Sequence, residues 1–347
     1  MQSRPPYLDT TEPGGSGQAL SARQVNSLPP AVFIMGPTAS GKTGLAMALA
    51  ERFDGALISV DSALVYRGMD IGTAKPTPQE LARHPHALVD IRDPTEPYNA
   101  ASFRDDALAE MARSSALGKL PILVGGTGLY FRALERGLDA MPAVDVAMRE
   151  RLTTEIKTLG APSLHARLRE RDPVTAARLH PNDSQRILRA LEILESGGHS
   201  ISTLQRGGDG DFPYQVLKIA LMPADRKALY RDIETRFRQM LDDGLVEEVR
   251  ALRERGDLNA ELPALRAVGY RQIWAYLEGE YDYPEMVRRA VVASRRYAKR
   301  QYTWLRGESR LLVLTGRGME NLAPAVGYLR AFLGAPDPTS QVSLSED

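Results

Sequence analysis

Short apolar stretches alternate along the chain with longer segments in which apolar residues recur at every third or fourth position. The apolar stretches predict strands at residues 31–35, 56–60, 87–91, 121–124, 215–221 and 310–315. The amphipathic segments predict helices at residues 42–53, 101–117, 128–136, 225–255, 264–278 and 284–305. Because strands separated by helices pair in parallel, the pattern predicts an α/β fold with a doubly wound parallel sheet. Ligands of such sheets bind beyond the carboxyl ends of the strands.

Residues 141–213 depart from this alternation and contain helical patterns without a clear strand. These helices are predicted at residues 148–158, 162–170, 173–179 and 184–196. We therefore predict a helical insertion over 141–213 that separates two parts of the sheet domain, 30–140 and 214–333. Residues 1–29 and 334–347 are rich in Pro, Gly, Ser and Thr and lack periodicity, which predicts two disordered tails.

A phosphate-binding motif follows the first predicted strand. The chain there reads Gly36-Pro37-Thr38-Ala39-Ser40-Gly41-Lys42-Thr43, which matches G-x-x-x-x-G-K-[ST]. Glycines let several backbone N–H groups point at one phosphate group, and the following helix adds partial positive charge. Lys42 is expected to neutralise the outer phosphate, and the Thr43 hydroxyl is expected to ligate Mg²⁺. The sequence therefore predicts a P-loop NTPase-like domain that binds a di- or triphosphate.

Two further strand ends carry candidate chemistry. Asp61 follows strand 56–60, which we expect to neighbour the phosphate-loop strand, so its carboxylate is expected at the mouth of the crevice. A turn-forming Asp is the plainer alternative. Strand 121–124 ends in glycines and Thr127 and lacks the acidic Mg²⁺ partner of many phosphate-loop ATPases, which argues mildly against a motor ATPase. Thr127 offers a hydroxyl to a ligand, caps the next helix, or does both.

Basic residues mark two candidate surfaces for RNA. One is the start of a helix in the insertion, formed by Gln185, Arg186, Ile187, Leu188 and Arg189. Arg186 and Arg189 share one side of that helix, where they either contact phosphates or pair with Glu192 as ordinary surface arginines. From these residues alone, the second alternative is favoured.

The other candidate surface lies near the C-terminus. It begins with Arg266, Ala267, Val268, Gly269, Tyr270 and Arg271. Tyr270 stands between two arginines, which is typical of base stacking beside phosphate contacts. Residues 288–306 then hold seven basic side chains and no acidic one, with Tyr297, Tyr302 and Trp304 among them. A solvated basic helix face is the alternative, but the absence of acids favours nucleic acid.

Composition narrows the class of protein. Lys and Arg total 44 and Asp and Glu total 44, so the formal net charge is zero and any affinity for nucleic acid is local. The chain has no cysteine, which excludes disulfides, thiolate catalysis and Cys-ligated zinc. It also lacks an apolar stretch near the ~20 residues that span a bilayer, and a signal-peptide core. We therefore expect a cytoplasmic protein with no membrane contact, and nothing demands more than a monomer.

Taken together, the motifs closely resemble those of bacterial tRNA dimethylallyltransferases, also called tRNA isopentenyltransferases. The resemblance rests on the strings at residues 36–43, 61–76, 90–94, 125–130, 180–186, 268–272 and 298–306. They follow the family order over roughly residues 30–310. Ala267 departs from the pattern because many relatives have cysteine there, and the N-terminal extension is not part of the family pattern.

The resemblance implies transfer of a dimethylallyl group from dimethylallyl diphosphate to N6 of adenosine at tRNA position 37. That adenosine lies 3′ of the anticodon in tRNAs that read codons starting with U. The phosphate loop then holds diphosphate with Mg²⁺, Asp61 acts as the base, Thr127 orients the reacting groups, and Arg236 adds a second cation. The resemblance also places residues against the anticodon stem-loop: Asp61, Ser62, Ala63, Leu64, Gln185 to Arg189, and Arg266 to Arg271.

Three alternatives stay open from the residues alone. A small-molecule kinase fits the phosphate loop, with Asp61 as the base for a hydroxyl group. An RNA-binding NTPase switch fits the loop and the basic helix without any covalent product. An adenylate isopentenyltransferase would use a free adenine nucleotide as acceptor, which the long RNA-contact strings disfavour.

Overall fold

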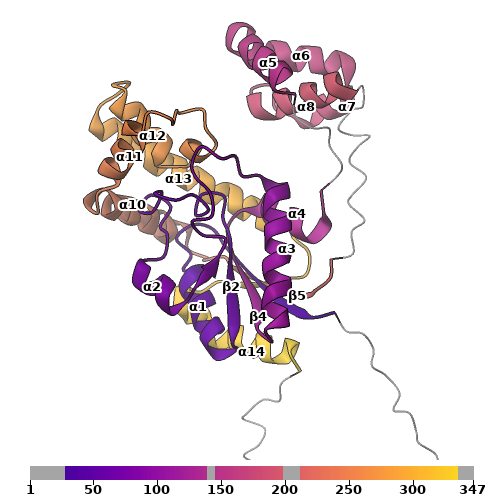
Figure 1. The fold of residues 1–347 in the computed structure, drawn as a ribbon, viewed down its shortest axis with the longest axis vertical. Helices are drawn as coiled ribbons and strands as arrows, with labels where there is room; N and C mark the ends of the chain where they lie inside the picture. Colours follow the sequence, from indigo (N-terminus) through magenta and orange to yellow (C-terminus); the bar gives the residue numbers. More distant parts are fainter. Residues whose placement is uncertain (1–27, 139–144, 198–211, 335–347) are drawn as a thin grey trace, which may run out of the picture.

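A six-stranded sheet organises the fold (Figure 1). The computed structural model describes residues 28–138, 145–197 and 212–334. The strand order is β3-β2-β4-β1-β5-β6, and every pair is parallel. The strands are β1 (Pro30–Met35), β2 (Gly55–Val60), β3 (His86–Ala87), β4 (Leu120–Gly125), β5 (Gln215–Leu221) and β6 (Leu311–Leu314). The predicted doubly wound parallel sheet is confirmed.

Helices cover both faces of this sheet. On one face, α1 (Lys42–Arg52) and α14 (Leu322–Phe332) pack against Val32, Ile34 and their neighbours. On the other face, α3 (Ala100–Ala116) and α4 (Gly128–Arg136) pack against Phe33 and Ile58. Burial on both faces explains why the central strands read as continuous apolar runs.

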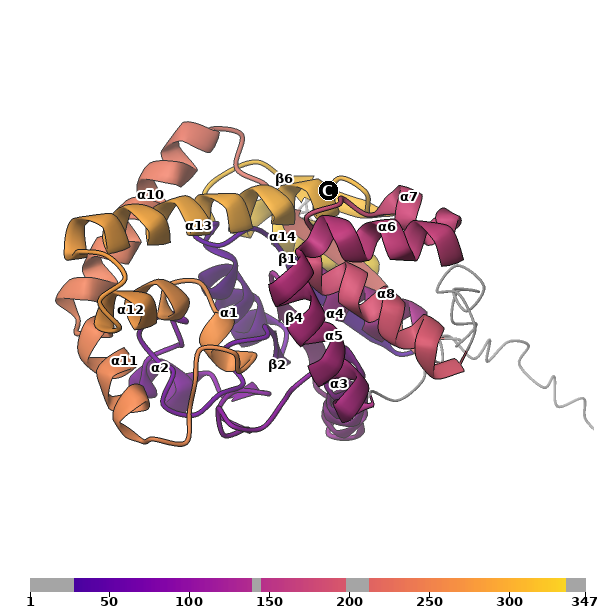
Figure 2. The ribbon, with the colours of Figure 1, turned by 90° about the horizontal axis from the view of Figure 1, so that it is seen from above.

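A group of helices from the C-terminal part gathers at one end of the sheet (Figures 1 and 2). It consists of α10 (Arg226–Asp242), α11 (Leu245–Glu254), η1 (Ala264–Arg266), α12 (Tyr270–Leu277) and α13 (Tyr283–Leu305). Two predicted long helices, 225–255 and 264–278, are each broken in the structure. Gly244 and Gly269 have φ of 99° and 95° at the breaks, a conformation that favours glycine.

The insertion forms a small helical unit with its own apolar core. Its helices are α5 (Val146–Leu159), α6 (Ala161–Arg171), α7 (Pro173–Arg178) and α8 (Ser184–Gly197). Leu152, Leu168 and Leu191 are buried among these helices, and Figure 1 shows the unit apart from the sheet. By residue 212 the chain is back on the sheet, because the Phe212 ring lies 6.1 Å from that of Phe33.

Several predicted boundaries fall outside the described residues. Residues 1–27, 139–144, 198–211 and 335–347 hold most of both predicted tails and the edges of the predicted insertion. Within the described part of the chain, no helix combines the length and hydropathy needed to cross a membrane.

The predicted strand at 87–91 is wrong. Strand β3 ends at Ala87, because Leu88 and Asp90 have φ of 63° and 56°, which a pleated strand does not allow. The loop after β3 is fixed instead by Lys75, whose buried ammonium forms ion pairs with Asp70 and Asp90. Lys75 therefore joins two loops and is not an unpaired cation for a phosphate group.

Glu248 on α11 fixes the loop that follows β2. Its carboxylate accepts the backbone N–H groups of Asp70, Ile71 and Gly72 at 2.9, 2.8 and 3.3 Å. It also accepts the hydroxyl of Tyr270, which is fully buried. A Cβ atom on Gly72 would lie 2.5 Å from the Tyr270 ring, so the loop and the ring are in close contact.

We expect Glu248→Ala to lower the free energy of unfolding by about 2–3 kcal/mol, because it removes charge-assisted hydrogen bonds to several donors. The matched control is Glu247→Ala, whose exposed carboxylate pairs only with Arg250, at 3.5 Å, among the described residues. We expect it to cost less than about 0.5 kcal/mol in urea denaturation. Equal losses in the two variants would contradict this account.

Candidate functional site

The site lies where three adjacent strands end. The phosphate loop follows β1, the segment with Gly126 and Thr127 follows β4, and Asp61 follows β2. Gly125 pairs with both Met35 and the last residue of β2, so the three ends are level. The expectation that β2 neighbours β1 is wrong, because β4 lies between them. This order places the glycine-rich segment at the centre of the site.

A cleft of about 380 Å³ opens over these strand ends. Many of the predicted site residues line it: Thr38, Ala39, Lys42, Thr43, Asp61, Ser62, Ala63, Leu64, Arg236, Arg266, Ala267 and Val268. The structure thus brings together residues from the phosphate loop, the segment after β2, α10, and the segment from η1 to the residue before Gly269. Tyr297, Arg300 and Gln301 of α13 also line the cleft. Sequence analysis missed Gln301, although it stands in one of the family-like strings.

The phosphate loop has the backbone of an anion site. Helix α1 begins at Lys42, so its first N–H groups have no acceptor within the helix. Gly36 has no room for a side chain, because a Cβ atom would lie 2.9 Å from the Leu221 carbonyl oxygen. Gly41 has φ of 82°, and the hydroxyl of Ser40 is buried without a hydrogen-bond partner. The loop therefore carries unsatisfied donors, as a phosphate site requires.

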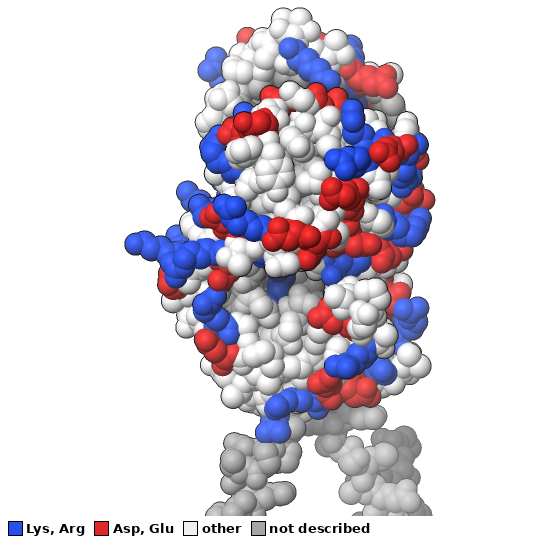
Figure 3. Space-filling view, turned by 90° about the vertical axis from the view of Figure 1, so that its left-hand side faces the viewer, with Lys and Arg blue, Asp and Glu red and all other residues white. Residues whose placement is uncertain are grey.

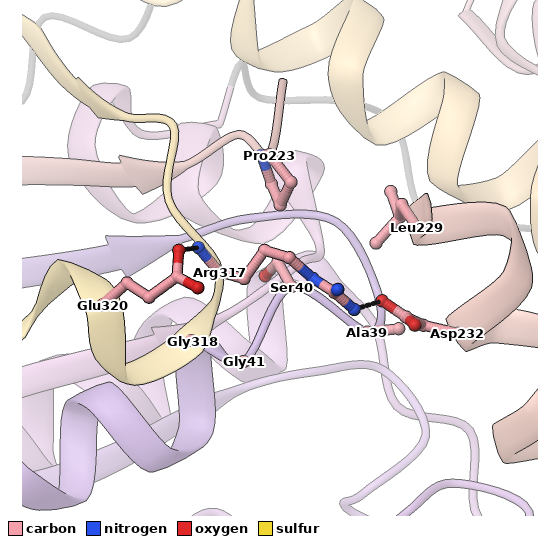
Figure 4. A pocket seen from close by; sticks show the side chains of 9 residues that line it. All are labelled: Ala39, Ser40, Gly41, Pro223, Leu229, Asp232, Arg317, Gly318 and Glu320. Carbon is pink, nitrogen blue, oxygen red and sulfur yellow. Dashed lines mark hydrogen bonds and ion pairs between the residues drawn. The ribbon is translucent and has the colours of Figure 1, made fainter. Parts of the chain in front are cut away.

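A second pocket, of about 330 Å³, adjoins the same loop beside η2 (Gly318–Asn321; Figure 4). It is lined by Ala39, Ser40, Gly41, Pro223, Leu229, Asp232, Arg317, Gly318 and Glu320. The Arg317 guanidinium forms an ion pair with Asp232 across it. A Cβ atom on Gly41 would lie 2.4 Å from the Cα atom of Gly318, so η2 contacts the loop backbone directly. The guanidinium in this pocket is therefore already paired.

Two partly buried cations, Lys42 and Arg236, face the cleft without a carboxylate partner among the described residues. Burial lowers the pKa of Lys42 to about 8; the Asp61 charge raises it and the Arg236 charge lowers it. Part of the Lys42 side chain reaches solvent, but protein surrounds its ammonium, whose hydrogen bond to the Pro37 carbonyl oxygen is long, at 3.4 Å. Burial also lowers the pKa of Arg236, against the Asp61 charge. Uncompensated, half-buried positive charge indicates an anion site.

The two carboxylate oxygens of Asp61 have different surroundings. Oδ1 accepts the backbone N–H groups of Ala63 and Leu64 at 2.8 and 3.4 Å, which forms an Asx turn. Within the described part of the chain, the other oxygen has no hydrogen-bond partner. Burial, followed by the Asp61 charge, raises the pKa of Tyr297. The turn and a role in chemistry are therefore compatible at Asp61.

Thr127 stands at the N-cap position of α4, but its hydroxyl caps no backbone N–H group. The hydroxyl is buried and has no hydrogen-bond partner; the Tyr297 phenol lies beside it without hydrogen-bond geometry. A buried, unpaired hydroxyl costs about 1–3 kcal/mol. The capping alternative is therefore not realised; Thr127 does not itself line the cleft, although its neighbours Gly125 and Tyr297 do.

The residues predicted to contact RNA divide into buried and exposed groups. Tyr270 is fully buried, so the expected stacking of its ring on a base is wrong for this structure. Ile187 is likewise buried in the insertion core. Arg189 pairs with Glu192 at 3.2 Å, as the plainer alternative predicted, while Gln185 and Arg186 are exposed.

The basic residues at 288–306 also divide into two groups, those that form ion pairs and those that do not. Arg288 and Arg289 pair with Glu285, and Arg295 pairs with Glu234. The other four basic residues of the run have no ion pair with a carboxylate of the described residues, and all four are exposed: Arg296, Lys299, Arg300 and Arg306. Figure 3 shows both charge signs interspersed on one face of the molecule, without a large area of one sign. Of these four, Arg300 lines the cleft.

Two interleaved aromatic residues of α13 belong to the core. The Tyr302 hydroxyl donates to the Pro223 carbonyl oxygen at 2.8 Å, and Trp304 stacks on Phe131 at 6.1 Å. Tyr297 alone of the three lines the cleft. The aromatic spacing on this helix thus reflects packing more than base recognition.

The family of the chain follows from sequence comparison. Residues 64–308 match the family described as IPP transferase. The chain belongs to the IPP transferase family. The match confirms the predicted resemblance, although the phosphate loop and Asp61 precede the matched range.

Solved structures agree with this IPP transferase assignment. The full-length tRNA isopentenylpyrophosphate transferase of Bacillus halodurans is 36% identical, with 89% of this chain and 97% of that chain covered and a TM-score of 0.65. The tRNA isopentenylpyrophosphate transferase of Staphylococcus epidermidis is 32% identical, with 88% and 99% covered and a TM-score of 0.63. A eukaryotic dimethylallyltransferase acting on tRNA shares the fold, at 24% identity, 89% and 81% coverage and a TM-score of 0.70.

The lowered pKa of Lys42 predicts pH-dependent binding of inorganic pyrophosphate. Its ammonium is charged below about pH 8 and loses its proton above it, while a bound anion stabilises the charged form. Affinity should therefore fall as the pH rises through that value, by up to about tenfold per pH unit. Calorimetry in buffers of different ionisation enthalpy should detect proton uptake on binding.

Lys42→Arg is the control, because arginine stays charged over this range. Protonation of free pyrophosphate affects its affinity for both proteins equally. The ratio of wild-type to variant affinity therefore reports the titration of Lys42 alone. A ratio that stays constant between about pH 7 and about pH 9 would contradict the prediction.

Proposed function

We propose that this chain is a tRNA dimethylallyltransferase that modifies N6 of adenosine at position 37 of tRNAs reading codons that start with U. One observation carries the proposal. Lys42 and Arg236 face the cleft without carboxylate partners in the described residues, beside the carboxylate of Asp61. That arrangement suits a diphosphate leaving group next to a base. The proposal takes a monomer as the acting unit.

The diphosphate of dimethylallyl diphosphate would bind the phosphate loop. The N–H groups at the start of α1, Lys42 and Arg236 would share its negative charge. Thr43 lines the same cleft and offers a hard hydroxyl oxygen, which fits Mg²⁺ bound mainly through phosphate and water. When bound, Mg²⁺ supplies further positive charge to the leaving group.

Asp61 would act as the general base. The N6 amine is a poor nucleophile, so its proton must leave as the new bond forms. The N–C bond forms at the allylic carbon while the C–O bond to diphosphate breaks, and the electron pair of that bond leaves with the diphosphate. The proton passes to the Asp61 oxygen that has no hydrogen-bond partner. The buried Thr127 hydroxyl would orient the amine or the bridging oxygen.

The RNA would approach from the side of α13 and the loop before α12. The target adenosine must leave its stack to reach Asp61. Arg271, Lys299 and Arg300 are exposed and, in the described chain, without carboxylate partners, so they are available for phosphate groups. The insertion, through Gln185 and Arg186, would contact a further part of the anticodon stem-loop.

Mass spectrometry of unmodified tRNA incubated with protein, Mg²⁺ and dimethylallyl diphosphate tests the reaction. We expect one added C5H8 unit on the anticodon-loop adenosine. Asp61→Asn keeps the Oδ1 acceptor of the Asx turn but removes the base, so we expect kcat to fall by about 100- to 10,000-fold with the fold intact.

Parallel assays with other substrates distinguish the alternative functions. Modification of AMP in preference to tRNA would favour an adenylate isopentenyltransferase. Consumption of ATP with a small acceptor, and no prenylated RNA, would favour a kinase. Nucleotide-dependent RNA affinity without any covalent product would favour a switch.

Binding measurements test the RNA surface. We expect Arg300→Ala or Arg271→Ala to weaken tRNA affinity several-fold. Each should also reduce the slope of log affinity against log salt concentration by the amount of about one phosphate contact. Arg288→Ala is the control, because that guanidinium already pairs with Glu285 at 2.6 Å. Equal losses for all three arginines would contradict this assignment of the surface.

A further inference from the structure

Gln301 joins the phosphate loop to the glycine-rich segment after β4. It lies on α13 with 5% of its surface exposed. Its Oε1 accepts the backbone N–H of Thr38 at 2.9 Å. Its Nε2 donates to the carbonyl oxygen of Gly126 at 3.0 Å. One side chain thus holds two strand ends that lie far apart in the sequence.

The fit around this amide is tight. A Cβ atom on Gly126 would lie 2.1 Å from Nε2 of Gln301, so a larger residue at that position would displace the amide. Because the Thr38 N–H is committed to Gln301, it is not among the donors left for a phosphate group. The amide therefore shapes the phosphate loop without being one of its ligands.

The same helix also faces the proposed RNA side. Arg300 is exposed and lines the cleft, and Tyr297, one turn earlier, lies beside the Thr127 hydroxyl. Gln301 follows Arg300 but points inward. Helix α13 is thus in contact with the phosphate loop, with the Thr127 segment and with the cleft at once.

We propose that Gln301 is a positioning residue that sets the spacing between the bound diphosphate and the Thr127 hydroxyl. The inference rests on the proposed prenyl transfer. The leaving group is held by the loop and the amine is oriented from the Thr127 segment, so their relative position decides whether the reacting atoms meet. A misplacement of about 1 Å at reacting atoms costs on the order of 100-fold in rate.

Gln301→Met tests the proposal, because it keeps the length of the side chain and removes both hydrogen bonds. We expect kcat to fall by at least about tenfold and pyrophosphate affinity to fall several-fold, while tRNA affinity stays within about twofold. The matched control is Tyr302→Phe, the next residue on α13, which loses one buried hydrogen bond, to the Pro223 carbonyl oxygen. Both variants should lower the melting temperature, but only the first should lower kcat.

Gln301→Glu adds a readout that loss of stability does not produce. A buried carboxyl group has a raised pKa, and its protonated form both accepts from Thr38 and donates to Gly126. Activity relative to wild type should therefore recover as the pH falls from about 8 to about 6. Gln301→Glu also keeps the test available if Gln301→Met fails to fold.

Three outcomes would overturn the proposal: a kcat of Gln301→Met within about twofold of wild type, an equal kcat loss in Tyr302→Phe, or no pH recovery in Gln301→Glu. Failure of the proposed function looks different, because wild-type protein would then give no prenylated tRNA. In that case the pyrophosphate affinities of Gln301→Met and Tyr302→Phe still measure the effect of Gln301 on the loop.

Discussion

The pairing of β4 with both β1 and β2 is the constraint on which the site depends. Parallel hydrogen bonding brings the carboxyl ends of these strands to one level, so three turns that are distant in sequence open onto one cleft. Small residues then allow close approach: a Cβ atom on Gly125 would lie 2.0 Å from the Val60 carbonyl oxygen. Without that contact the Asp61 carboxylate and the phosphate loop would not face the same volume.

The site stores unfavourable interactions that a ligand relieves. Lys42 and Arg236 are desolvated without carboxylate partners in the described chain, and the hydroxyls of Ser40 and Thr127 are buried without hydrogen bonds. Each raises the free energy of the unliganded protein. A diphosphate that satisfies these groups would therefore stabilise the folded state as well as bind. By contrast, the buried ammonium of Lys75 is paired with Asp70 and Asp90.

Helix α13 combines packing, positioning and surface charge on different faces. Tyr302 and Gln301 face inward and hydrogen-bond to backbone groups of other elements, whereas Lys299 and Arg300 are exposed. A sequence window over this helix mixes these faces, which is why its aromatic and basic residues together suggested one nucleic-acid surface. Part of the basic run instead pairs with Glu285 and Glu234. Of the residues of this run that have no ion pair in the described chain, Arg300 lines the cleft.

Local sequence determined the parts of this protein whose physics is local: the phosphate loop, the apolar strands buried on both faces, the amphipathic helices and the family-like strings. Tertiary structure alone decided the strand order that put β4 between β1 and β2, the burial of Tyr270 under the 70–72 loop, and the breaks at Gly244 and Gly269. It also decided that Thr127 caps nothing and that Gln301 bridges to Thr38 across 263 residues of sequence. Such partners are chosen by packing between distant segments, and neither periodicity nor motif spacing encodes which distant backbone group a side chain will meet.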